Sequence, residues 1–318
     1  MGESANVDIL GKSMLDWVRL ALGETEVSVA DYRNDVELPL LVRPFVKEGY
    51  DYIVVLFSDT PLITRKTVLS AVDEAFNSGR TVIKMTRGYV LSCAYVMGAD
   101  KLYTNDTFYF DEEDFITAFN YRQVGLITDV LKNRILEFHM NKGVHFKDVA
   151  STIIGCDVAI DEGVTIGYGN VITGRTKIKQ GAVLGNGNAI CDCIIGEGAL
   201  VDGARLSKTF VGKDAQVGAY CVCSKDVILG EKVVLDARVT VKNSQVGVSS
   251  QVGSGTVISD AELGKNVIVG ANCVILPSVK VGEGSFIAAG STISENVSPR
   301  STAIARARQS QQSNKSDN

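Results

Sequence analysis

The sequence predicts a long parallel β-helix that follows a small α/β domain. The main observation is a beat of six: between Ile154 and Ile293, an aliphatic residue recurs at nearly every sixth position. The first seven members are each six residues apart: Ile154, Ile160, Ile166, Ile172, Ile178, Leu184 and Ile190. The later members are Ile195, Val201, Val211, Val217, Cys223, Leu229, Leu235, Val241, Val246, Val252, Ile258, Leu263, Val269, Ile275, Val281, Ile287 and Ile293. The second observation is a set of helix and strand patterns in the first 134 residues.

A period of six excludes an α-helix for this region. Six residues at about 100° each advance the chain by roughly 600°, so successive members point in different directions and form no stripe. In extended chain the side-chain period is two, so every sixth residue returns to the same face. Glycines that often follow the aliphatic residue permit a bend between short strands. Hexapeptide repeats of this kind indicate a β-helix. The alternative is a sandwich of short strands, for which irregular strand lengths are expected.

Residues 1–134 have the pattern of an α/β domain. Met14–Leu22 carries a helical stripe that Ser13 can cap. The apolar run Tyr52–Phe57 predicts a strand covered on both faces. Thr64 can begin a further helix that Ser78-Gly79 ends, and Gly125–Met140 also has a helical pattern.

These patterns predict four segments. The α/β domain occupies residues 1–134, a linker 135–150, the β-helix 151–299 and a C-terminal tail 300–318. In the tail, Gln309–Asn318 is polar enough to be disordered.

Composition narrows the classes of function. The chain has 318 residues and a formal charge of −5, and no basic block stands out, which argues against a dedicated nucleic-acid binder. No signal peptide and no apolar run of about 20 residues is visible, so we expect no membrane partner. An odd number of cysteines, seven, then indicates reduced thiols in a cytoplasm. Cys191/Cys193 and Cys221/Cys223 lack the two-residue gap of thiolate zinc sites, so we expect small core and corner residues there.

Four segments resemble one bacterial enzyme family. Gly11-Lys12-Ser13-Met14-Leu15 resembles a Gly-Lys-Pro-Met-Leu motif, and the segment Leu56–Ile63 resembles Leu-Tyr-Gly-Asp-Val-Pro-Leu-Ile. His139–Val144 resembles a His-Met-x-x-Gly-Val motif that leads into the β-helix, and the segment Ile287–Gln309 matches most closely. The family is the bifunctional N-acetylglucosamine-1-phosphate uridyltransferase/glucosamine-1-phosphate N-acetyltransferases. The likeness covers the β-helix well and the first domain in fragments, as in a reduced, diverged member.

The resemblance implies a fold and two activities. Family members transfer acetyl groups from acetyl-CoA in a left-handed, trimeric β-helix. They transfer uridylyl groups in an N-terminal Rossmann-like domain with Mg²⁺, within UDP-N-acetylglucosamine and cell-wall biosynthesis. We therefore expect a truncated Rossmann-like nucleotidyltransferase domain, a homotrimer, and a sugar phosphate or sugar nucleotide as ligand.

Two residues match the metal ligands of the family. Asp59 follows the apolar strand, at the end where ligands of open α/β sheets collect, and a carboxylate there can hold Mg²⁺. The resemblance assigns the second ligand to Asn120, in Phe119-Asn120-Tyr121-Arg122. Alternatively, Asp59 caps its loop and Asn120 is a turn residue. The family's Gly-rich phosphate loop would precede Gly11, and the ten residues there do not match it.

The acetyl-transfer motifs are matched only in part. By resemblance, Ala289 contacts the pantetheine arm of acyl-CoA, Arg306 pairs with a CoA phosphate, and Lys242 contacts the sugar phosphate. The family's catalytic His falls at Ser254, and the only histidines, His139 and His145, precede the β-helix. The catalytic residue is therefore unknown. Lys242 and Arg306 can equally be solvated side chains, and Ala289 part of a tight corner.

These motifs favour a transferase of the UDP-N-acetylglucosamine pathway with depleted catalytic residues. The alternative is a catalytically silent, trimeric scaffold or a sensor of sugar nucleotides or CoA. A carbonic-anhydrase-like enzyme requires several histidines on the coil, and the sequence has none there.

Overall fold

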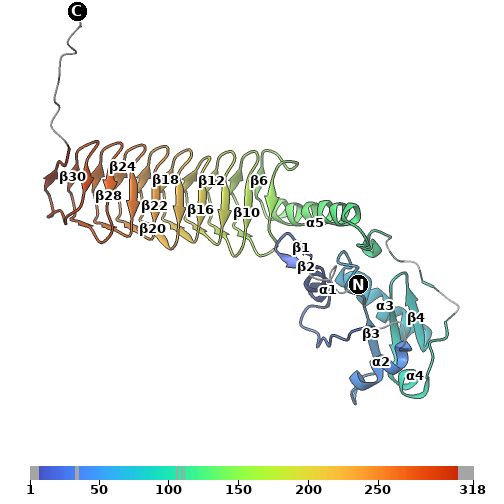
Figure 1. Ribbon diagram of the computed structural model, residues 1–318. Helices are drawn as coiled ribbons and strands as arrows, with labels where there is room; N and C mark the ends of the chain where they lie inside the picture. Colours follow the sequence, from blue (N-terminus) through green and yellow to red (C-terminus); the bar gives the residue numbers. More distant parts are fainter. Residues whose placement is uncertain (1–6, 33–35, 105–106, 109, 111, 307–318) are drawn as a thin grey trace, which may run out of the picture. The chain divides into compact units, whose positions relative to one another are not determined.

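The computed structural model describes residues 7–32, 36–104, 107–108, 110 and 112–306. The chain divides into two compact units, residues 1–133 and 134–318 (Figure 1). Helix α5 (Tyr121–Asn141) contains the boundary between them. Among the described residues, no helix combines the length and apolarity needed to cross a membrane.

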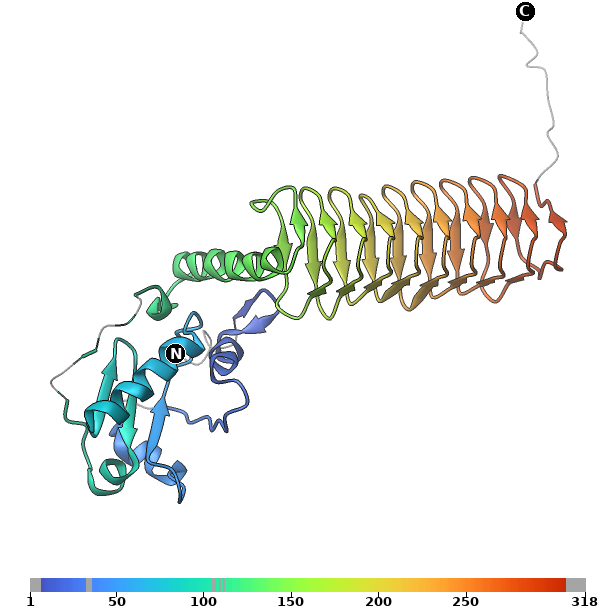
Figure 2. The ribbon, with the colours of Figure 1, turned by 180° about the vertical axis from the view of Figure 1, so that it is seen from behind.

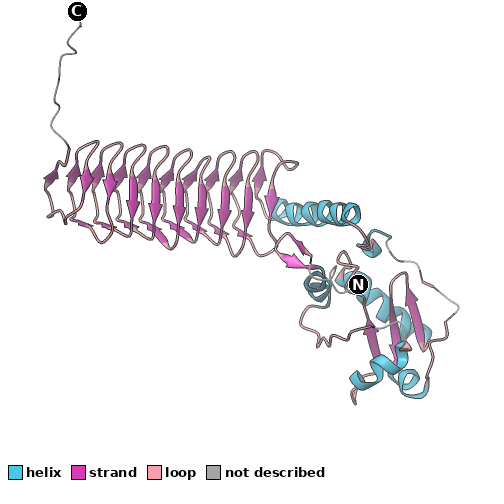
Figure 3. Ribbon diagram, in the orientation of Figure 1, coloured by secondary structure: helices cyan, strands magenta, loops and turns pink. Residues whose placement is uncertain are grey.

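The second unit is a left-handed parallel β-helix, as the beat of six and the family resemblance predicted. Its described strands form three parallel sheets, visible as stacked arrows in Figures 2 and 3. The first sheet contains β7 (Ile153–Ile154), β10 (Val171–Thr173), β13 (Ala189–Cys191), β16 (Arg205–Ser207), β19 (Val222–Ser224), β22 (Thr240–Lys242), β25 (Val257–Ser259), β28 (Val274–Ile275) and β31 (Thr292–Ile293).

The other two sheets complete each coil. The second contains β8 (Ala159–Ile160), β11 (Lys177–Ile178), β14 (Ile194–Ile195), β17 (Thr209–Val211), β20 (Val227–Leu229), β23 (Gln245–Val246), β26 (Glu262–Leu263) and β29 (Lys280–Val281). The third contains β6 (His145–Phe146), β9 (Thr165–Ile166), β12 (Val183–Leu184), β15 (Leu200–Val201), β18 (Gln216–Val217), β21 (Val234–Leu235), β24 (Gln251–Val252), β27 (Ile268–Val269), β30 (Phe286–Ile287) and β32 (Thr302–Ala303). Regular parallel pairing of these short strands excludes the sandwich.

The aliphatic residues of the beat form the interior of the β-helix. All of the predicted members are buried, and they belong to one apolar cluster. Each coil pairs a member with its equivalent in the next coil, for example Ile154 with Ile172 and Ile172 with Ile190. The structure also fills the gap in the beat between Val201 and Val211, where the buried residue is Leu206 on β16.

The shorter steps in the beat fall at corners between the first and second sheets. Where the interval falls from six residues to five, one residue in the left-handed region makes the corner. Such residues are Asp192 (φ 53°), Asn243 (φ 44°) and Asp260 (φ 49°). Asp and Asn tolerate this conformation better than most residues with a Cβ, because their side chains bond locally. At Asp260 the carboxylate accepts hydrogen bonds from Asn243 and Ser259, which lowers the pKa of that carboxyl.

The first unit is an α/β unit around a three-stranded sheet. Its described elements are β1 (Asp8–Ile9), β2 (Lys12–Ser13), α1 (Met14–Leu22), α2 (Leu38–Val42), the 3-10 helix η2 (Arg43–Phe45), β3 (Tyr52–Val55), α3 (Arg65–Ser78), β4 (Val82–Met85), β5 (Gly88–Ser92), α4 (Cys93–Gly98) and the 3-10 helix η3 (Glu112–Phe115). The sheet order is β3-β5-β4, and both pairings are antiparallel.

The predicted boundaries of α1 and α3 are confirmed. The Ser13 hydroxyl accepts a hydrogen bond from the Asp16 amide at 3.2 Å and caps α1. The Thr64 hydroxyl accepts from the Thr67 amide at 3.2 Å and caps α3, which ends at the left-handed Gly79. Helix α5 includes the predicted range and extends beyond both of its ends.

The strand predicted at Tyr52–Phe57 is covered on both faces, as expected: Tyr52 and Val54 pack against one apolar cluster, and Ile53 and Val55 pack against another. Strand β3 is shorter and every one of its residues is half-buried. Among the described strands β3 lies at one edge of the sheet, and β5 takes the central position instead. An edge strand has a neighbour on one side only, so an apolar run does not by itself distinguish it from a central strand.

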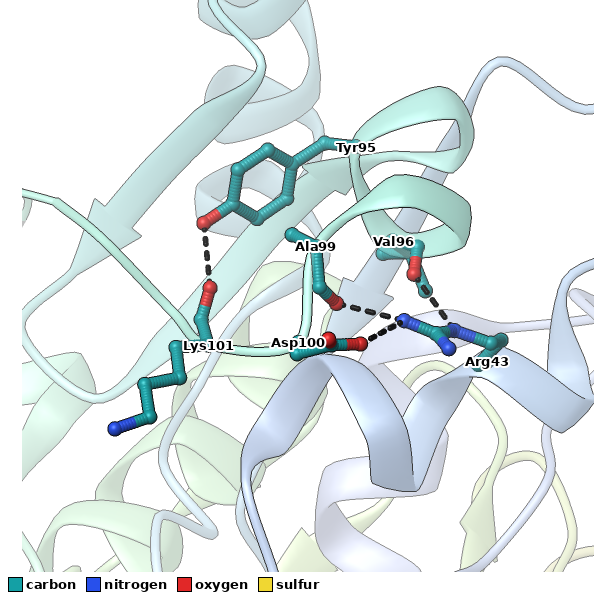
Figure 4. A network of polar contacts seen from close by, with 6 residues as sticks. All are labelled: Arg43, Tyr95, Val96, Ala99, Asp100 and Lys101. Atoms are coloured by element: carbon teal, nitrogen blue, oxygen red, sulfur yellow. Dashed lines mark hydrogen bonds and ion pairs between the residues drawn. The ribbon is translucent and has the colours of Figure 1, made fainter.

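Arg43 connects η2 to the end of α4 (Figure 4). Its guanidinium donates to the carbonyl oxygens of Val96 at 3.1 Å and Ala99 at 2.8 Å, and to the Asp100 carboxylate at 3.2 Å. Val96 lies in the last turn of α4 and Ala99 is its C-cap residue, and the carbonyl oxygens at a helix end have no partner inside the helix. Arg43 is therefore a structural residue.

The segments predicted as a linker and a tail contain helix and strand residues. Within residues 135–150, α5 continues to Asn141 and β6 pairs with β9. In the tail, β32 pairs with β30. The polar run Gln309–Asn318 lies outside the described residues.

Candidate functional site

An ion pair engages the first predicted metal ligand, Asp59. Its Oδ1 accepts from Arg87 Nε at 3.1 Å, and its Oδ2 accepts from Arg87 Nη2 at 2.6 Å. Both carboxylate oxygens are thus bound by one guanidinium in a bidentate pair, the strongest common geometry for these groups. The hydrogen bonds to Asp59 raise the pKa of Arg87 above its ordinary value.

Sheet pairing brings these two residues together. Arg87 lies in the two-residue turn between β4 and β5, where Met85 pairs with Gly88. Val55 at the end of β3 pairs with Tyr89, so the loop after β3 and the β4–β5 turn share one edge of the sheet. Gly88 has φ 138°, and a Cβ there would lie 2.9 Å from the Val55 carbonyl oxygen. A glycine is therefore required where the hairpin passes β3.

Aromatic rings flank the Arg87 guanidinium. Its central carbon lies 4.7 Å from the centroid of Phe57 and 5.9 Å from that of Phe119. Tyr32 packs edge-on against Phe57, with centroids 5.9 Å apart. Cation–π contacts of this kind hold a guanidinium in one orientation.

The ion pair borders a large cavity of the N-terminal unit. The cavity has a volume of about 1100 Å³, and Asp59, Arg87 and Phe119 all contribute to its lining. The side chains of Asp59 and Arg87 remain 18% and 33% exposed, so a ligand in the cavity can reach them.

The second predicted metal ligand, Asn120, follows a segment that is hydrogen-bonded to the backbone of Asp59. The Ala118 amide donates to the Asp59 carbonyl oxygen at 3.2 Å. However, Asn120 Oδ1 accepts a hydrogen bond from the Gln123 amide at 3.0 Å, and the Gln123 side chain accepts one from the Phe119 amide at 2.9 Å. Asn120 is thus the N-terminal cap of α5.

These residues do not fit a Mg²⁺ ion in the observed arrangement. Mg²⁺ requires oxygen ligands at about 2.0–2.1 Å in octahedral geometry. Both oxygens of Asp59 are bound to a cation, and Asn120 Oδ1 is occupied by a backbone amide. Among the described residues there is also no group of three or more His, Cys, Asp and Glu side chains that could hold a metal.

A second candidate site lies on the β-helix, at the corners that follow the third sheet. Gly253-Ser254-Gly255 follows β24, Ala271-Asn272 follows β27, and Ala289-Gly290 follows β30. Hydrogen bonds join these corners: the Asn272 amide donates to the Ser254 carbonyl oxygen, and the Gly290 amide to that of Ala271, both at 2.9 Å. We call the line formed by Ser254, Ala271, Ala289 and Arg306 the corner column.

Arg306 continues this column beyond the last corner. Its Cδ lies 3.7 Å from the point that a Cβ on Gly290 would occupy. Ala289 and Arg306 are both exposed. The structure therefore brings the two residues predicted to bind acyl-CoA to the same corner.

Lys242 is not part of this arrangement. It is exposed at the end of β22, in the first sheet, where it pairs with Ser224 and Ser259. The corner column instead follows the third sheet. In the first sheet, β25 and β28 separate β22 from β31, the strand that follows Ala289.

Neither histidine lies near the corner column. His139 is buried on α5, where burial lowers the pKa of its imidazole. His145 is exposed on β6, and five strands separate β6 from β24 in the third sheet. At about 4.8 Å per strand, His145 lies roughly 29 Å from the coil of Ser254.

Arg87 was missed by the sequence analysis. Thr86-Arg87 is not one of the Asn-Gly or Asp-Gly type dipeptides that indicate a two-residue hairpin, and nothing in the sequence pairs that hairpin with the strand before Asp59. The paired cysteines lie within the β-helix, where Cys193, Cys221 and Cys223 are buried.

Comparison with protein families matches two parts of the β-helix. The model of the bacterial transferase hexapeptide (six repeats) matches residues 260–295, and that of the GMPPB C-terminal domain matches residues 153–256. Bifunctional protein GlmU from Clostridium botulinum (strain Langeland) is 33% identical over 205 residues, which cover 57% of this chain and 45% of that protein. GlmU from Clostridium novyi is 32% identical over 222 residues, which cover 62% and 49%.

The predicted family resemblance is confirmed. The chain spans about half the length of the GlmU relatives that it matches. Among solved structures, LpxA from Acinetobacter baumannii is 19% identical, covers 51% of this chain and 71% of its own, and gives a TM-score of 0.48.

Proposed function

We propose that the chain is a transferase-family protein of the UDP-N-acetylglucosamine pathway whose β-helix binds an acyl-CoA along the corner column. The observation that carries the proposal is that Ser254, Ala289 and Arg306 share this column. The family resemblance assigns the positions of the catalytic base and of two acyl-CoA contacts to these same residues. The relationship to GlmU proteins supports the pathway.

The chemistry of the column suits an acyl-CoA. An arginine can donate two parallel hydrogen bonds to a phosphate group, and Arg306 is exposed at the end of the column. Ala289 offers a small side chain at an exposed corner, which leaves room for a thin pantetheine chain. Ser254 lies three coils from Arg306 in the third sheet, at about 4.8 Å per coil, so an extended ligand anchored at Arg306 can reach it.

Acyl transfer to an amine needs a general base, and Ser254 is poorly suited to that role. A serine hydroxyl does not ionise near neutral pH, and neither histidine lies near its coil. Loss of a general base typically costs about a hundred- to ten-thousandfold in rate. We therefore expect slow or negligible acetylation of glucosamine-1-phosphate. The resemblance gives Lys242 a contact with the sugar phosphate. In that role Lys242 would reach the ligand from a different corner of the coil than the corner column does.

A catalytically silent scaffold or sensor is the second candidate function. Ser254 at the expected base position favours it, because binding of CoA does not require a base. A homotrimer is compatible with both candidates.

Calorimetric titration of the full chain with CoA and acetyl-CoA tests the proposal. We expect binding that Arg306→Gln weakens about tenfold, as for loss of a charge-assisted hydrogen bond. Arg300→Gln is a matched control, because Arg300 is also an exposed arginine close to the end of the β-helix but lies at another corner. An acetylation assay with glucosamine-1-phosphate near neutral pH separates the two candidates.

Two results would contradict these statements. Absence of heat with either CoA species removes the acyl-CoA site. Rapid acetylation at neutral pH shows that another group acts as the base and excludes the silent scaffold.

A further inference from the structure

The strongest unexplained feature is the guanidinium at the position where the family resemblance expects a metal ion. Arg87 binds both oxygens of Asp59, at 3.1 and 2.6 Å, on the wall of the N-terminal cavity. A divalent cation at Asp59 would have to break this bidentate pair. It would also have to sit beside a fixed positive charge, which costs further electrostatic free energy.

We propose that Arg87 acts as a built-in cation in place of a divalent metal, and that it binds the phosphate group of a ligand in this cavity without Mg²⁺. The ligand class is a nucleoside diphosphate or a free pyrophosphate, which present the same phosphate chemistry.

The geometry leaves donors for such a ligand. Asp59 uses Nε and one N–H of Nη2, so the N–H groups of Nη1 and the second N–H of Nη2 stay available. Among the described residues, no hydrogen bond from Nη1 is observed. Since the side chain is 33% exposed at the cavity, phosphate oxygens can accept from this edge of the guanidinium.

The surroundings hold the guanidinium ready for binding. Asp59 fixes its plane, and the central carbon of the guanidinium lies over the rings of Phe57 and Phe119. A fixed donor loses less conformational entropy when a ligand binds than a mobile one does. Asp59 thus acts as a positioning residue for Arg87 rather than as a metal ligand.

Titration of the full chain with UDP and with pyrophosphate, each in EDTA and in MgCl₂, tests the proposal. We expect the Kd for at least one ligand to agree within about twofold between the two buffers. Tighter binding of UDP than of pyrophosphate indicates that the nucleoside also contacts the cavity, whereas equal binding identifies the phosphates as the whole determinant.

Substitutions at Arg87 provide the sharper comparison. Arg87→Gln should weaken binding in EDTA about tenfold or more, and Arg87→Lys should recover only part of the loss because it lacks the bidentate fork. In Arg87→Gln, Asp59 is released, so Mg²⁺ should now improve binding. Arg80→Gln is the matched control: Arg80 stacks on Phe108 in the same unit but does not line the cavity. Thermal unfolding of each variant shows whether the unit stays folded.

Three results would overturn the proposal: wild-type binding that EDTA abolishes, no binding of either ligand in either buffer, or unchanged affinity in a folded Arg87→Gln variant. The experiment rests on the N-terminal unit and on phosphate ligands. Its failure is therefore distinguishable from failure of the acyl-CoA proposal, which rests on Arg306 and the β-helix.

Discussion

At the scale of single residues, burial in the β-helix changes the chemistry of cysteine. Cys193 is 1% exposed, and burial raises the pKa of its thiol from 9.0 to about 11. The thiol of Cys223 is also buried, and the pKa shift there has the same direction and the same leading cause. Because the thiolate is the reactive form, both residues should behave as small apolar side chains rather than as nucleophiles or ligands.

This shift predicts that the β-helix loses stability at alkaline pH. Below pH 9 the Cys193 thiol is neutral in both folded and unfolded chains, so it adds no pH dependence. Between pH 9 and about 11 it ionises only in the unfolded chain, which favours unfolding. Chemical denaturation between pH 8 and pH 11 should show this decrease, and Cys193→Ala should reduce it. An identical pH profile for the variant would contradict the assignment.

Hydrogen-bonded polar residues inside the coil are the part that sequence reasoning did not foresee. Asn170 and Asn188 are fully buried, and Asn188 Nδ2 donates to Asn170 Oδ1 at 2.8 Å. The side chain of Asn188 also bonds to Val201 and Ala204 in the next coil. An asparagine in a strand-and-turn pattern reads as an exposed turn residue, and only the stacking of coils provides it with buried partners.

At the scale of elements, neighbouring residues of a short strand in the β-helix alternate between the outer surface and the interior. On β10, Val171 is 39% exposed and Ile172 is fully buried, although both are aliphatic. The beat of six identified the buried member because the side-chain period of a strand fixes its face. The same reasoning located the helices through their stripes and caps. It could not give the order of β3, β5 and β4, because that order depends on pairing between distant segments.

Truncation of Ile172 and of Val171 to alanine should change the free energy of unfolding by very different amounts. Ile172→Ala should lower the free energy of unfolding by about 2–5 kcal/mol, since it leaves a cavity in the stacked interior. Val171→Ala, the matched control, should change it by about 0.5 kcal/mol or less. Denaturant titration of both variants measures the difference, and equal costs would be inconsistent with the observed burial.

The sequence motifs covered one of the two candidate sites more fully than the other. Ala289 and Arg306 were recognised because the local motif near the end of the β-helix is nearly intact. In the N-terminal unit, Asp59 was recognised from the segment after an apolar strand, but its partner Arg87 is 28 residues away in sequence. The role of Asp59 depends on its ion pair with Arg87. The sequence therefore identified the carboxylate but not the positive charge that binds it.

At the scale of the whole molecule, the outer face of the β-helix favours self-association. Ile194, Phe210 and Ile228 lie in register on three consecutive strands of the second sheet, and each is more than 40% exposed. Adjacent exposed apolar side chains of this kind commonly mark an interface. In a closed ring of identical copies, each copy can cover the exposed face of a neighbour.

We therefore predict a homotrimer in solution. Light scattering should give about three times the chain mass of 34.0 kDa. Phe210→Lys should shift the equilibrium toward the monomer, because it places a charge in the apolar patch. Tyr220→Lys is the control, since Tyr220 is exposed at a corner rather than in the patch. A wild-type monomer at micromolar concentration would exclude the trimer and any mechanism that needs residues from two copies.

The coil-to-coil register also limits how such a chain can change its length during evolution. Ile154, Ile172 and Ile190 occupy the same place in successive coils. Duplication of one entire coil, roughly 18 residues, keeps every later residue in its own sheet. Duplication of a single hexad would instead move each later strand to the next sheet and transfer the corner column to a different edge. Relatives should therefore differ in length by whole coils, with shorter insertions confined to the corners.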